Sequence, residues 1–481
     1  MRSPRRIAEA VTRLAHPGPS RGRTRHSKVG LSQVRDDGPS DLCTFAGMPL
    51  EGLLAAHVDE VQYSQDPLGR RGQWRETASI VVRTLISRRA PETSSAKVLH
   101  IRSSEQEHLA MISSSVAESL GEEVAILSAD AAGRDAFLDA IWSSTLFDVV
   151  RSFGFAMFRR KRIWQCLRDE AMPEGPTPGM VVIFWRQLLL GLSMRRFLER
   201  QNYLECVTAD FDRGYLTGPW FAAASSLSIP SCSFQHGVIF PSGVVSGFSP
   251  LVADAIGVWG SPAREQLIRE GVDPKRIHVV GNAALPIYVV PQDHMRELRE
   301  NPKPGVPAAV VLALSGWDSE KNRALVEMFS AIKRRCDKED IHFLVRLHPA
   351  YPTDEFQWIR RDFGLDVADR AASLEEFIRS TSVLLVADST FGIVGLANGI
   401  PTGRAEVKEE RINSGTGYVE YLGIPEVSCY EDFQALLLRE QVLDRERVMA
   451  VIGDPVGSRI TDMIASLRLE PGKRVSRLPL G

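Results

Sequence analysis

Short runs of β-branched residues alternate with stretches of helical periodicity from about residue 97 onward, and this alternation constrains the fold more than any other feature. It is typical of parallel sheets covered by helices on both faces, so we expect an α/β fold. The series runs twice, on either side of a segment with five prolines, residues 286–307. A segment of this kind suits a connection between domains. The sequence therefore predicts two Rossmann-like domains that face one another across a cleft.

The chain divides on this basis into four parts. They are a basic, disordered tail at 1–45, a first domain at 46–290, a second domain at 305–468 and a C-terminal tail at 469–481. The predicted strands are 97–101, 124–128, 204–208, 230–234, 255–259, 308–314, 342–347 and 383–387. The predicted helices include 135–150, 218–227, 320–335, 354–363 and 374–379. The apolar stretch 180–192 is too short to cross a bilayer, so we expect it to be a buried helix.

Basic and acidic residues nearly balance over the whole chain, but its start is rich in basic residues. It has 58 Lys and Arg against 60 Asp and Glu, a net charge of −2, which argues against a protein that coats nucleic acid. Residues 1–30 carry eight basic residues and one acidic residue, Glu9. This start favours a disordered extension, with a transit peptide or an anchor on an anionic surface as alternatives. We expect a cytoplasmic protein whose basic start is a candidate peripheral contact with the inner face of the cell membrane.

Several common kinds of site have no signature in the sequence. The six cysteines are scattered, without a Cys-x-x-Cys pair or a neighbouring histidine at zinc-ligand spacing, which favours reduced thiols. There is no Gly-x-x-x-x-Gly-Lys-Ser/Thr loop, no Gly-x-Gly-x-x-Gly after the first strand of either domain and no Gly-x-Ser-x-Gly. A nucleotide triphosphatase, an ordinary dehydrogenase and a nucleophile-elbow hydrolase are therefore disfavoured.

Polar groups follow two predicted strands of the first domain. Asp210 and Asp212 come after strand 204–208, where two carboxylates could supply a general base or bind a divalent metal, or could simply shape a turn. Gln235, His236 and Gly237 follow strand 230–234. Histidine suits proton transfer near neutral pH, and the glycine leaves room for a ligand, although a lone histidine is often structural. We interpret both groups as candidate catalytic or acceptor-side residues.

The second domain carries phosphate-directed groups in the same position. Arg346 and His348 alternate at the end of strand 342–347, so both could face one anion, and Pro349 would fix the exit of the chain. Ser389 and Thr390 follow strand 383–387, where they could cap a helix or meet a phosphate. The loop that follows predicted strand 308–314 contains Gly316 and could line the same pocket.

The order of these motifs resembles that of the GT-B glycosyltransferase superfamily, most closely its bacterial surface-polysaccharide, capsule and CDP-glycerol glycerophosphotransferase-like branch. The resemblance covers roughly residues 95–465 and implies a nucleotide-activated donor held mainly by the second domain, an acceptor on the first domain and no obligatory metal or other cofactor. The motifs that carry it are Gln235-His236-Gly237, Gly281-Asn282, His348-Pro349, Ser389-Thr390 and Gly399-Ile400-Pro401.

The resemblance also implies roles for individual residues. His236 matches the histidine of the first domain in such enzymes, and Asp210 or Asp212 falls near their acidic strand-end position. His348 matches the histidine of the His-Pro motif, and Ser389 with Thr390 the hydroxyl pair that meets the donor phosphate. Many relatives have a glutamate just before the Gly-x-Pro turn, where this chain has Ala397-Asn398.

The expected function is that of a metal-independent glycosyltransferase in surface polysaccharide or glycoconjugate biosynthesis. Its partners would be a nucleotide-sugar donor and a glycan, lipid-linked or small-molecule acceptor. Transfer requires a base for the acceptor hydroxyl and a cationic site for the departing phosphate, and both kinds of group are present. The alternatives on the same frame are a glycerophosphotransferase, a nucleotide-sugar 2-epimerase and a non-catalytic protein that only binds a nucleotide sugar.

Overall fold

A computed structural model of the protein describes twenty stretches of the 481-residue chain. They are residues 44–45, 48–49, 53, 95–103, 107–128, 146–167, 178–201, 203–212, 216–239, 248, 251–284, 309–314, 319–336, 341–347, 356–368, 373–387, 391–407, 421–438, 445–453 and 457–468.

The predicted C-terminal tail 469–481, the proline-rich segment 286–307 and residues 1–43 of the predicted N-terminal tail 1–45 lie outside them, whereas Thr44 and Phe45 of that tail form a short strand.

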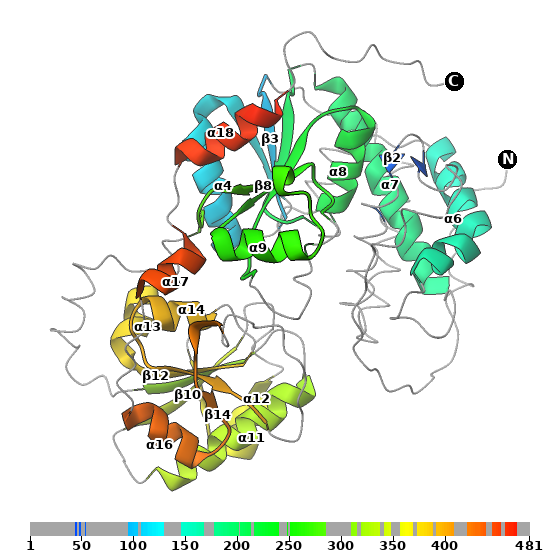
Figure 1. Ribbon diagram of the computed structural model, residues 1–481. Helices are drawn as coiled ribbons and strands as arrows, with labels where there is room; N and C mark the ends of the chain where they lie inside the picture. Colours follow the sequence, from blue (N-terminus) through cyan, green and yellow to red (C-terminus); the bar gives the residue numbers. More distant parts are fainter. Residues whose placement is uncertain are drawn as a thin grey trace.

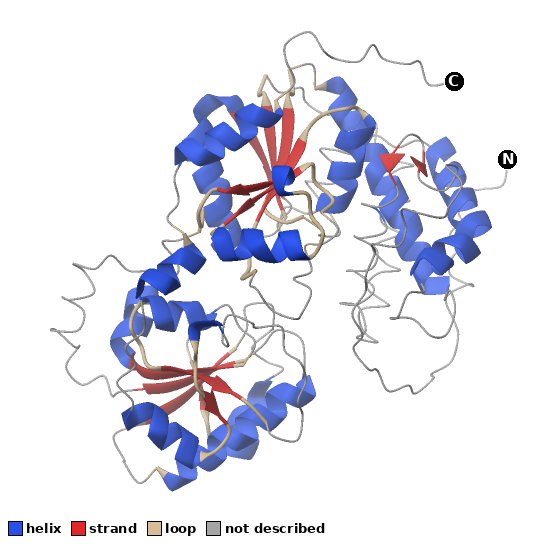
Figure 2. Cartoon of the chain, viewed as in Figure 1, coloured by secondary structure: helices blue, strands red, loops and turns tan. Residues whose placement is uncertain are grey.

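The chain forms two six-stranded sheets in which every neighbouring pair of strands is parallel (Figures 1 and 2). The first has the order β4-β3-β5-β6-β7-β8 and the second the order β11-β10-β9-β12-β13-β14. These are the two common orders of doubly wound domains, so the predicted α/β class and the two Rossmann-like units are confirmed. The strands of the first sheet are β3 Val98–Arg102, β4 Val124–Ser128, β5 Cys206–Ala209, β6 Ser231–Phe234, β7 Ala255–Val258 and β8 Ile277–Val279. Those of the second are β9 Ala309–Ala313, β10 His342–Arg346, β11 Asp366–Val367, β12 Thr381–Val386, β13 Thr402–Ala405 and β14 Glu426–Val427.

Helices cover both faces of the first sheet, because alternate side chains of its strands are apolar on each side. Val98 and Cys206 pack toward α4 and α18, while Ile256 and Val258 pack toward α9 on the other face, which α8 also covers. The bounds are α4 Glu107–Leu120, α8 Thr217–Ser226, α9 Ser261–Arg269 and α18 Gly457–Leu467, with short 3-10 turns η3 Gly121–Glu123 and η4 Pro274–Arg276.

The second sheet is covered in the same way. Val311 and Leu384 face α13 and α14, whereas Leu312 and Leu385 face α11, α12 and α16. The bounds are α11 Ser319–Arg335, α12 Gln357–Phe363, α13 Leu374–Ser380, α14 Phe391–Ala397 and α16 Tyr430–Leu438.

A pair of long helices, α6 Leu146–Leu167 and α7 Pro178–Arg200, lies beside the first domain (Figure 1). Helix α7 packs on α8, and α6 packs on α7. The expectation of a buried helix at 180–192 is confirmed, since the described side chains from Val182 to Ser193 are all buried. The short strands β1 Thr44–Phe45 and β2 Met48–Pro49 pair with one another, and Phe45 and Met48 join the same core. Among the helices described, none is both long enough and apolar enough to span a membrane.

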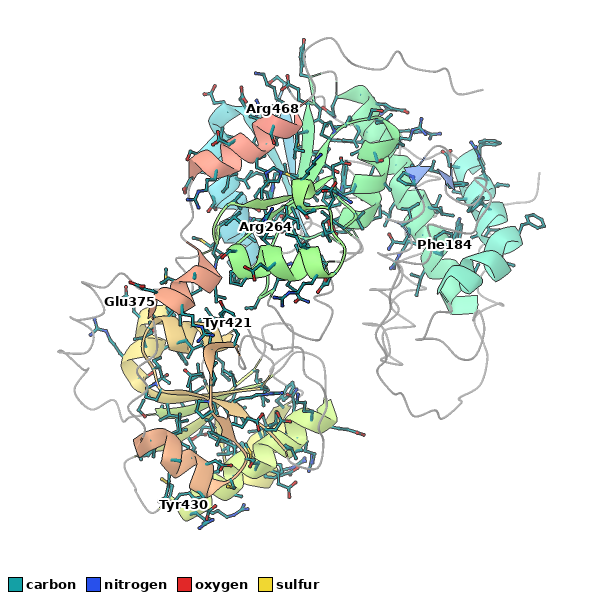
Figure 3. The ribbon with its side chains drawn as sticks, viewed as in Figure 1. Phe184, Arg264, Glu375, Tyr421, Tyr430 and Arg468 are labelled. Carbon is teal, nitrogen blue, oxygen red and sulfur yellow. The ribbon has the colours of Figure 1, made fainter. Side chains whose placement is uncertain are left out.

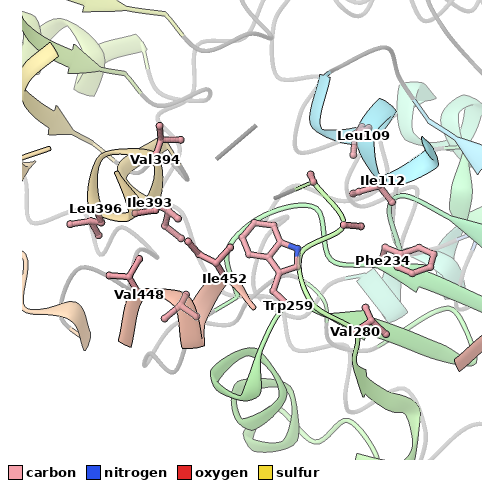
Figure 4. Packing of buried hydrophobic residues seen from close by; sticks show 14 of the residues in the cluster. Leu109, Ile112, Phe234, Trp259, Val280, Ile393, Val394, Leu396, Val448 and Ile452 are labelled. Atoms are coloured by element: carbon pink, nitrogen blue, oxygen red, sulfur yellow. The ribbon is translucent and has the colours of Figure 1, made fainter. Parts of the chain in front are cut away.

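The C-terminal helices connect the two domains. Helix α17 Arg445–Ile452 packs on α14 and on α9, and Val448 and Ile452 share one apolar cluster with Trp259 (Figure 4). The chain then turns at Gly453, whose φ of 66° and close approach to the Trp259 carbonyl leave no room for a side chain. Helix α18, within the range predicted for the second domain, packs on α4 of the first. Arg468, labelled in Figure 3, lies just after α18 and forms an ion pair of 2.6 Å with Glu123, which adds to this contact.

Candidate functional site

Asp210 lies at the point of the first sheet where the strand order reverses. That point is between β3 and β5, and open α/β sheets bind ligands there, outside the carboxyl ends of the strands. The Asp210 carboxylate accepts the backbone N–H of Ser103, at 2.9 Å to Oδ2 and 3.2 Å to Oδ1. Because Ser103 follows β3 and Asp210 follows β5, one side chain spans the switch point.

The protonation of Asp210 is unusual. Its side chain is fully buried, and burial raises the pKa of the carboxyl to about 7, although the Ser103 hydrogen bonds and the charge of Arg102 act in the opposite direction. A carboxyl with this pKa exchanges a proton near neutral pH, which is the range that a general base requires. Its position and its pKa make Asp210 a candidate acid–base group.

Asp212, two residues further on, has different surroundings. One oxygen, Oδ1, accepts the Ser233 hydroxyl and the Ala253 N–H, each at 3.0 Å, and Oδ2 accepts the Val252 N–H at 3.0 Å. Through these hydrogen bonds the Asp212 carboxylate links the loop after β5 to β6 and to the segment before β7. The two carboxylates thus have separate partners, and the part of the chain that the structure describes contains no cluster of three His, Cys, Asp or Glu residues suited to a metal ion.

His236 lies beside the same loop and is held by aromatic rings. Its imidazole is 4.2 Å from the Phe211 ring, centroid to centroid, in an edge-on arrangement, and 5.3 Å from the Phe248 ring. Phe211 stands between Asp210 and Asp212 in the sequence. The structure therefore brings the predicted histidine and the predicted aspartate loop together.

Gln235 connects two strand ends. Its Nε2 donates to the Gly237 carbonyl, and its Oε1 accepts the Trp259 N–H, both at 2.8 Å. The Trp259 indole N–H in turn donates to the Gln235 carbonyl at 2.8 Å. These bonds fix the turn that carries His236 and join it to the tryptophan that packs on α17.

Arg346 ends β10 in the second sheet and lies on an aromatic platform. The guanidinium carbon is 4.4 Å from the centroid of Phe391, the first residue of α14, and 5.4 Å from that of Phe377. The two rings pack edge to face, 4.7 Å apart. Because Phe391 follows β12, on the far side of β9 from β10, the arginine side chain reaches across the switch point of the second sheet.

The other predicted phosphate-directed residues, Gly316, His348, Pro349, Ser389 and Thr390, lie outside the described residues. The strand ends that precede them are adjacent: Leu314 N–H donates to the Arg346 carbonyl at 3.0 Å, and Ala387 N–H donates to the Ala313 carbonyl at 3.1 Å. The segments that carry these residues therefore leave three neighbouring strands.

Sequence reasoning missed a buried polar network beneath Asp210. The His100 ring lies 2.8 Å from the Thr208 hydroxyl and 3.0 Å from the Ser113 hydroxyl. Burial, and secondarily the charge of Arg102, lowers the pKa of His100 to about 3, so the ring is neutral at physiological pH. His100 and Thr208 stand inside predicted strands, where alternation gives no sign that a polar pair faces the core. Ser103, two residues beyond predicted strand 97–101, and Phe391, directly after Thr390, were also missed.

Comparison with known proteins finds similar folds among solved structures, at low sequence identity. No family model and no curated protein matches the sequence. The UDP-GlcNAc 2-epimerase of Methanocaldococcus jannaschii, solved with UDP-GlcNAc and UDP, is similar with a TM-score of 0.48 and 13% identity, covering 77% of this chain and 99% of that one. The UDP-GlcNAc 2-epimerase of Neisseria meningitidis, bound to UDP-GlcNAc, has a TM-score of 0.45 and 10% identity over 77% and 99%. The wall teichoic acid polymerase TagF has a TM-score of 0.43 and 11% identity over 82% and 98%. Each likeness is one of fold.

Proposed function

We propose that this protein is a glycosyltransferase of the GT-B type, which moves a sugar from a nucleotide-activated donor to an acceptor hydroxyl in surface polysaccharide or glycoconjugate biosynthesis. The observation that carries the proposal is the buried carboxylate of Asp210, which bridges the switch point of the first sheet with a pKa of about 7. The second sheet offers the complementary group, the Arg346 guanidinium at its own switch point.

In the proposed reaction Asp210 is the base. It takes the proton of the acceptor hydroxyl while that oxygen forms a bond to the anomeric carbon of the donor sugar, and the bond from that carbon to the phosphate oxygen breaks. His236 orients the acceptor, since its ring is fixed by Phe211 beside the base. Asp212 and Gln235 hold the two loops in place through the hydrogen bonds described above.

Arg346 stabilises the departing nucleotide diphosphate. A guanidinium forms paired hydrogen bonds with phosphate oxygens, and the Phe391 ring limits the directions in which it can point. We assign His348, Ser389 and Thr390 to the same phosphate, with Gly316 and Pro349 shaping the segments around it, because all five follow neighbouring strand ends. Cationic and neutral donors of this kind need no divalent metal.

The test is a thermal-shift screen of the full chain against UDP-, CMP-, GDP- and CDP-linked ligands, followed by calorimetry on the ligand that stabilises it. We expect one class to bind and to bind equally in the presence of a chelator. Arg346→Ala should weaken that binding. Arg323→Ala is the matched control, since Arg323 also lies on aromatic rings, those of Trp358 and Phe363, but belongs to α11. Binding abolished by the chelator, or equal loss in both variants, would contradict the proposed donor site.

Product analysis then identifies the reaction. A sugar attached to an added acceptor supports transfer. A changed sugar on the intact nucleotide without any acceptor would indicate an epimerase, and transfer of glycerol phosphate a glycerophosphotransferase. Binding without turnover would indicate a non-catalytic protein, and each of these three results would replace the proposed function.

A further inference from the structure

Helix α6 has apolar side chains on two opposite sides. On one side Val149 and Ala156 are buried against α7 and the first domain. On the other side Phe147, Val150 and Phe158 are exposed, with 69%, 64% and 91% of their surfaces accessible. A surface helix normally carries polar residues on the side away from the core. We call the exposed set of Phe147, Val150 and Phe158 the outer face of α6.

The outer face is continuous along the helix. Its residues are spaced three and eight positions apart, which places them on one side of an α-helix. Gly154 falls on the same side, between Val150 and Phe158, and a side chain added there would meet nothing within 4 Å. The open space at Gly154 agrees with the exposure of its neighbours, and the face extends over about three turns.

The helix cannot rotate to bury this face, because polar contacts fix its inner side. The Trp185 indole N–H of α7 donates to the Ser152 hydroxyl at 2.9 Å. Asp148 forms an ion pair of 2.6 Å with Arg196, also of α7. Both contacts are on the side opposite to the outer face, and α6 is the outermost of the three packed helices α8, α7 and α6 (Figure 1).

The charge of α6 indicates what covers the outer face. The helix carries five basic residues, Arg151 and the run Arg159-Arg160-Lys161-Arg162, against one acidic residue, Asp148. Asp148 is buried and paired with Arg196, so its charge is directed inward. Exposed aromatic residues followed in the same helix by a basic run are the pattern of helices that lie in the interface of an anionic bilayer.

We propose that the outer face of α6 docks on an anionic lipid surface, with Phe147, Val150 and Phe158 entering the headgroup region and the net positive charge of the α6 sequence favouring anionic lipids. This contact is separate from the predicted one through the basic start of the chain. It does not depend on the proposed catalytic function, because none of its residues belongs to the strand-end sites.

The test is co-sedimentation of the full chain with vesicles of phosphatidylcholine alone and of phosphatidylcholine mixed with phosphatidylglycerol. We expect binding to the mixed vesicles and little to the neutral ones, with binding reduced in about 1 M salt, where charges are screened beyond about 3 Å. The double variant Phe147→Ser/Phe158→Ser should lower the bound fraction about tenfold or more, since it removes two aromatic anchors. Its melting temperature should stay near that of the wild type, because both side chains are largely exposed.

The matched control is Leu437→Ser, which removes an exposed apolar side chain, 48% accessible, from α16 of the second domain. It should bind mixed vesicles like the wild type. Three results would overturn the proposal: no binding of the wild type to mixed vesicles, equal binding by the double variant, or equal loss in the control. A wild type that ignores vesicles but forms a dimer, lost in the double variant, would identify the face as a contact between two copies of the chain.

Discussion

The two sheets of this protein place opposite chemistry at equivalent positions. In the first sheet, order 2-1-3-4-5-6 in sequence, the switch point is bridged by the buried carboxylate of Asp210. In the second, order 3-2-1-4-5-6, it is crossed by the guanidinium of Arg346 on its aromatic platform. A group that can accept a proton near pH 7 and a group that is always cationic suit different parts of one transfer reaction. The two domains therefore differ in strand order, and under the proposed function they also divide the chemistry.

The largest expected effect comes from removing the carboxylate of the first sheet. Asp210→Asn should lower turnover by about 10²–10⁴, because the amide cannot accept the proton, and should leave donor affinity within about threefold. Steady-state kinetics and calorimetry measure the two effects. Asp254→Asn is the control: its carboxylate accepts the Ser231 N–H at the opposite end of the same sheet. Normal turnover in Asp210→Asn would remove the catalytic role from the first switch point.

The same substitution should change how stability depends on pH. The pKa of Asp210 rises from 3.8 to about 7 on folding, so the folded chain keeps a proton that the unfolded chain releases. This contribution to stability is fully present below about pH 4 and is lost as the pH rises through about 7, on the order of 4 kcal/mol in unfolding free energy.

Because asparagine is neutral, the unfolding free energy of Asp210→Asn should exceed that of the wild type above pH 7 and approach it near pH 4. Denaturant titrations at the two pH values measure the difference. A variant that is less stable at both pH values would show that the carboxylate is a structural group.

The third effect lies in the second sheet. Arg346→Ala should weaken donor binding by about 10- to 100-fold, the range of a lost hydrogen bond to a charged group, and Arg346→Lys should recover part of it. Calorimetry measures both variants, and turnover at saturating donor should fall less than in Asp210→Asn. If Arg346→Ala instead affected only the acceptor, the division of roles between the sheets would be wrong.

The smallest effect is expected at His236. If it orients the acceptor beside Asp210, His236→Ala should raise the acceptor KM by up to about tenfold and leave kcat within about threefold. Initial rates at varied acceptor concentration separate the two constants. A loss of kcat as large as that of Asp210→Asn would transfer the role of base to the histidine.

The sequence predicted the strands better than the contacts between distant segments. Residues 124–128 were predicted as a strand and form β4, because a compact run of apolar and β-branched residues has one local interpretation. The role of Asp212 could not be predicted, since its partners Val252 and Ala253 lie about 40 residues away. Its neighbour Asp210 has a different partner, and the two aspartates look alike in the sequence.

Helices were predicted less well where their surroundings are unusual. The expected helix 135–150 only overlaps the start of α6, which continues to Leu167. Apolar residues on two opposite sides of α6 weaken the periodic signal that marks a helix with one buried face. The periodicity of α18 likewise predicts that one side of the helix is buried. It does not indicate that this side packs on the first domain.

The return of α18 to the first domain has a consequence for the synthesis of the chain. The Thr461 hydroxyl donates to the Ser119 carbonyl, a contact between residues 342 positions apart. A ribosome releases the N-terminal part of the chain first. Helix α18 can therefore pack on α4 only after nearly the whole second domain has been synthesised, and one side of α4 stays uncovered until then. Contacts of such separation also slow folding after release. The first domain is therefore the last to be finished, and a chain stopped after the second sheet would expose apolar surface that chaperones recognise.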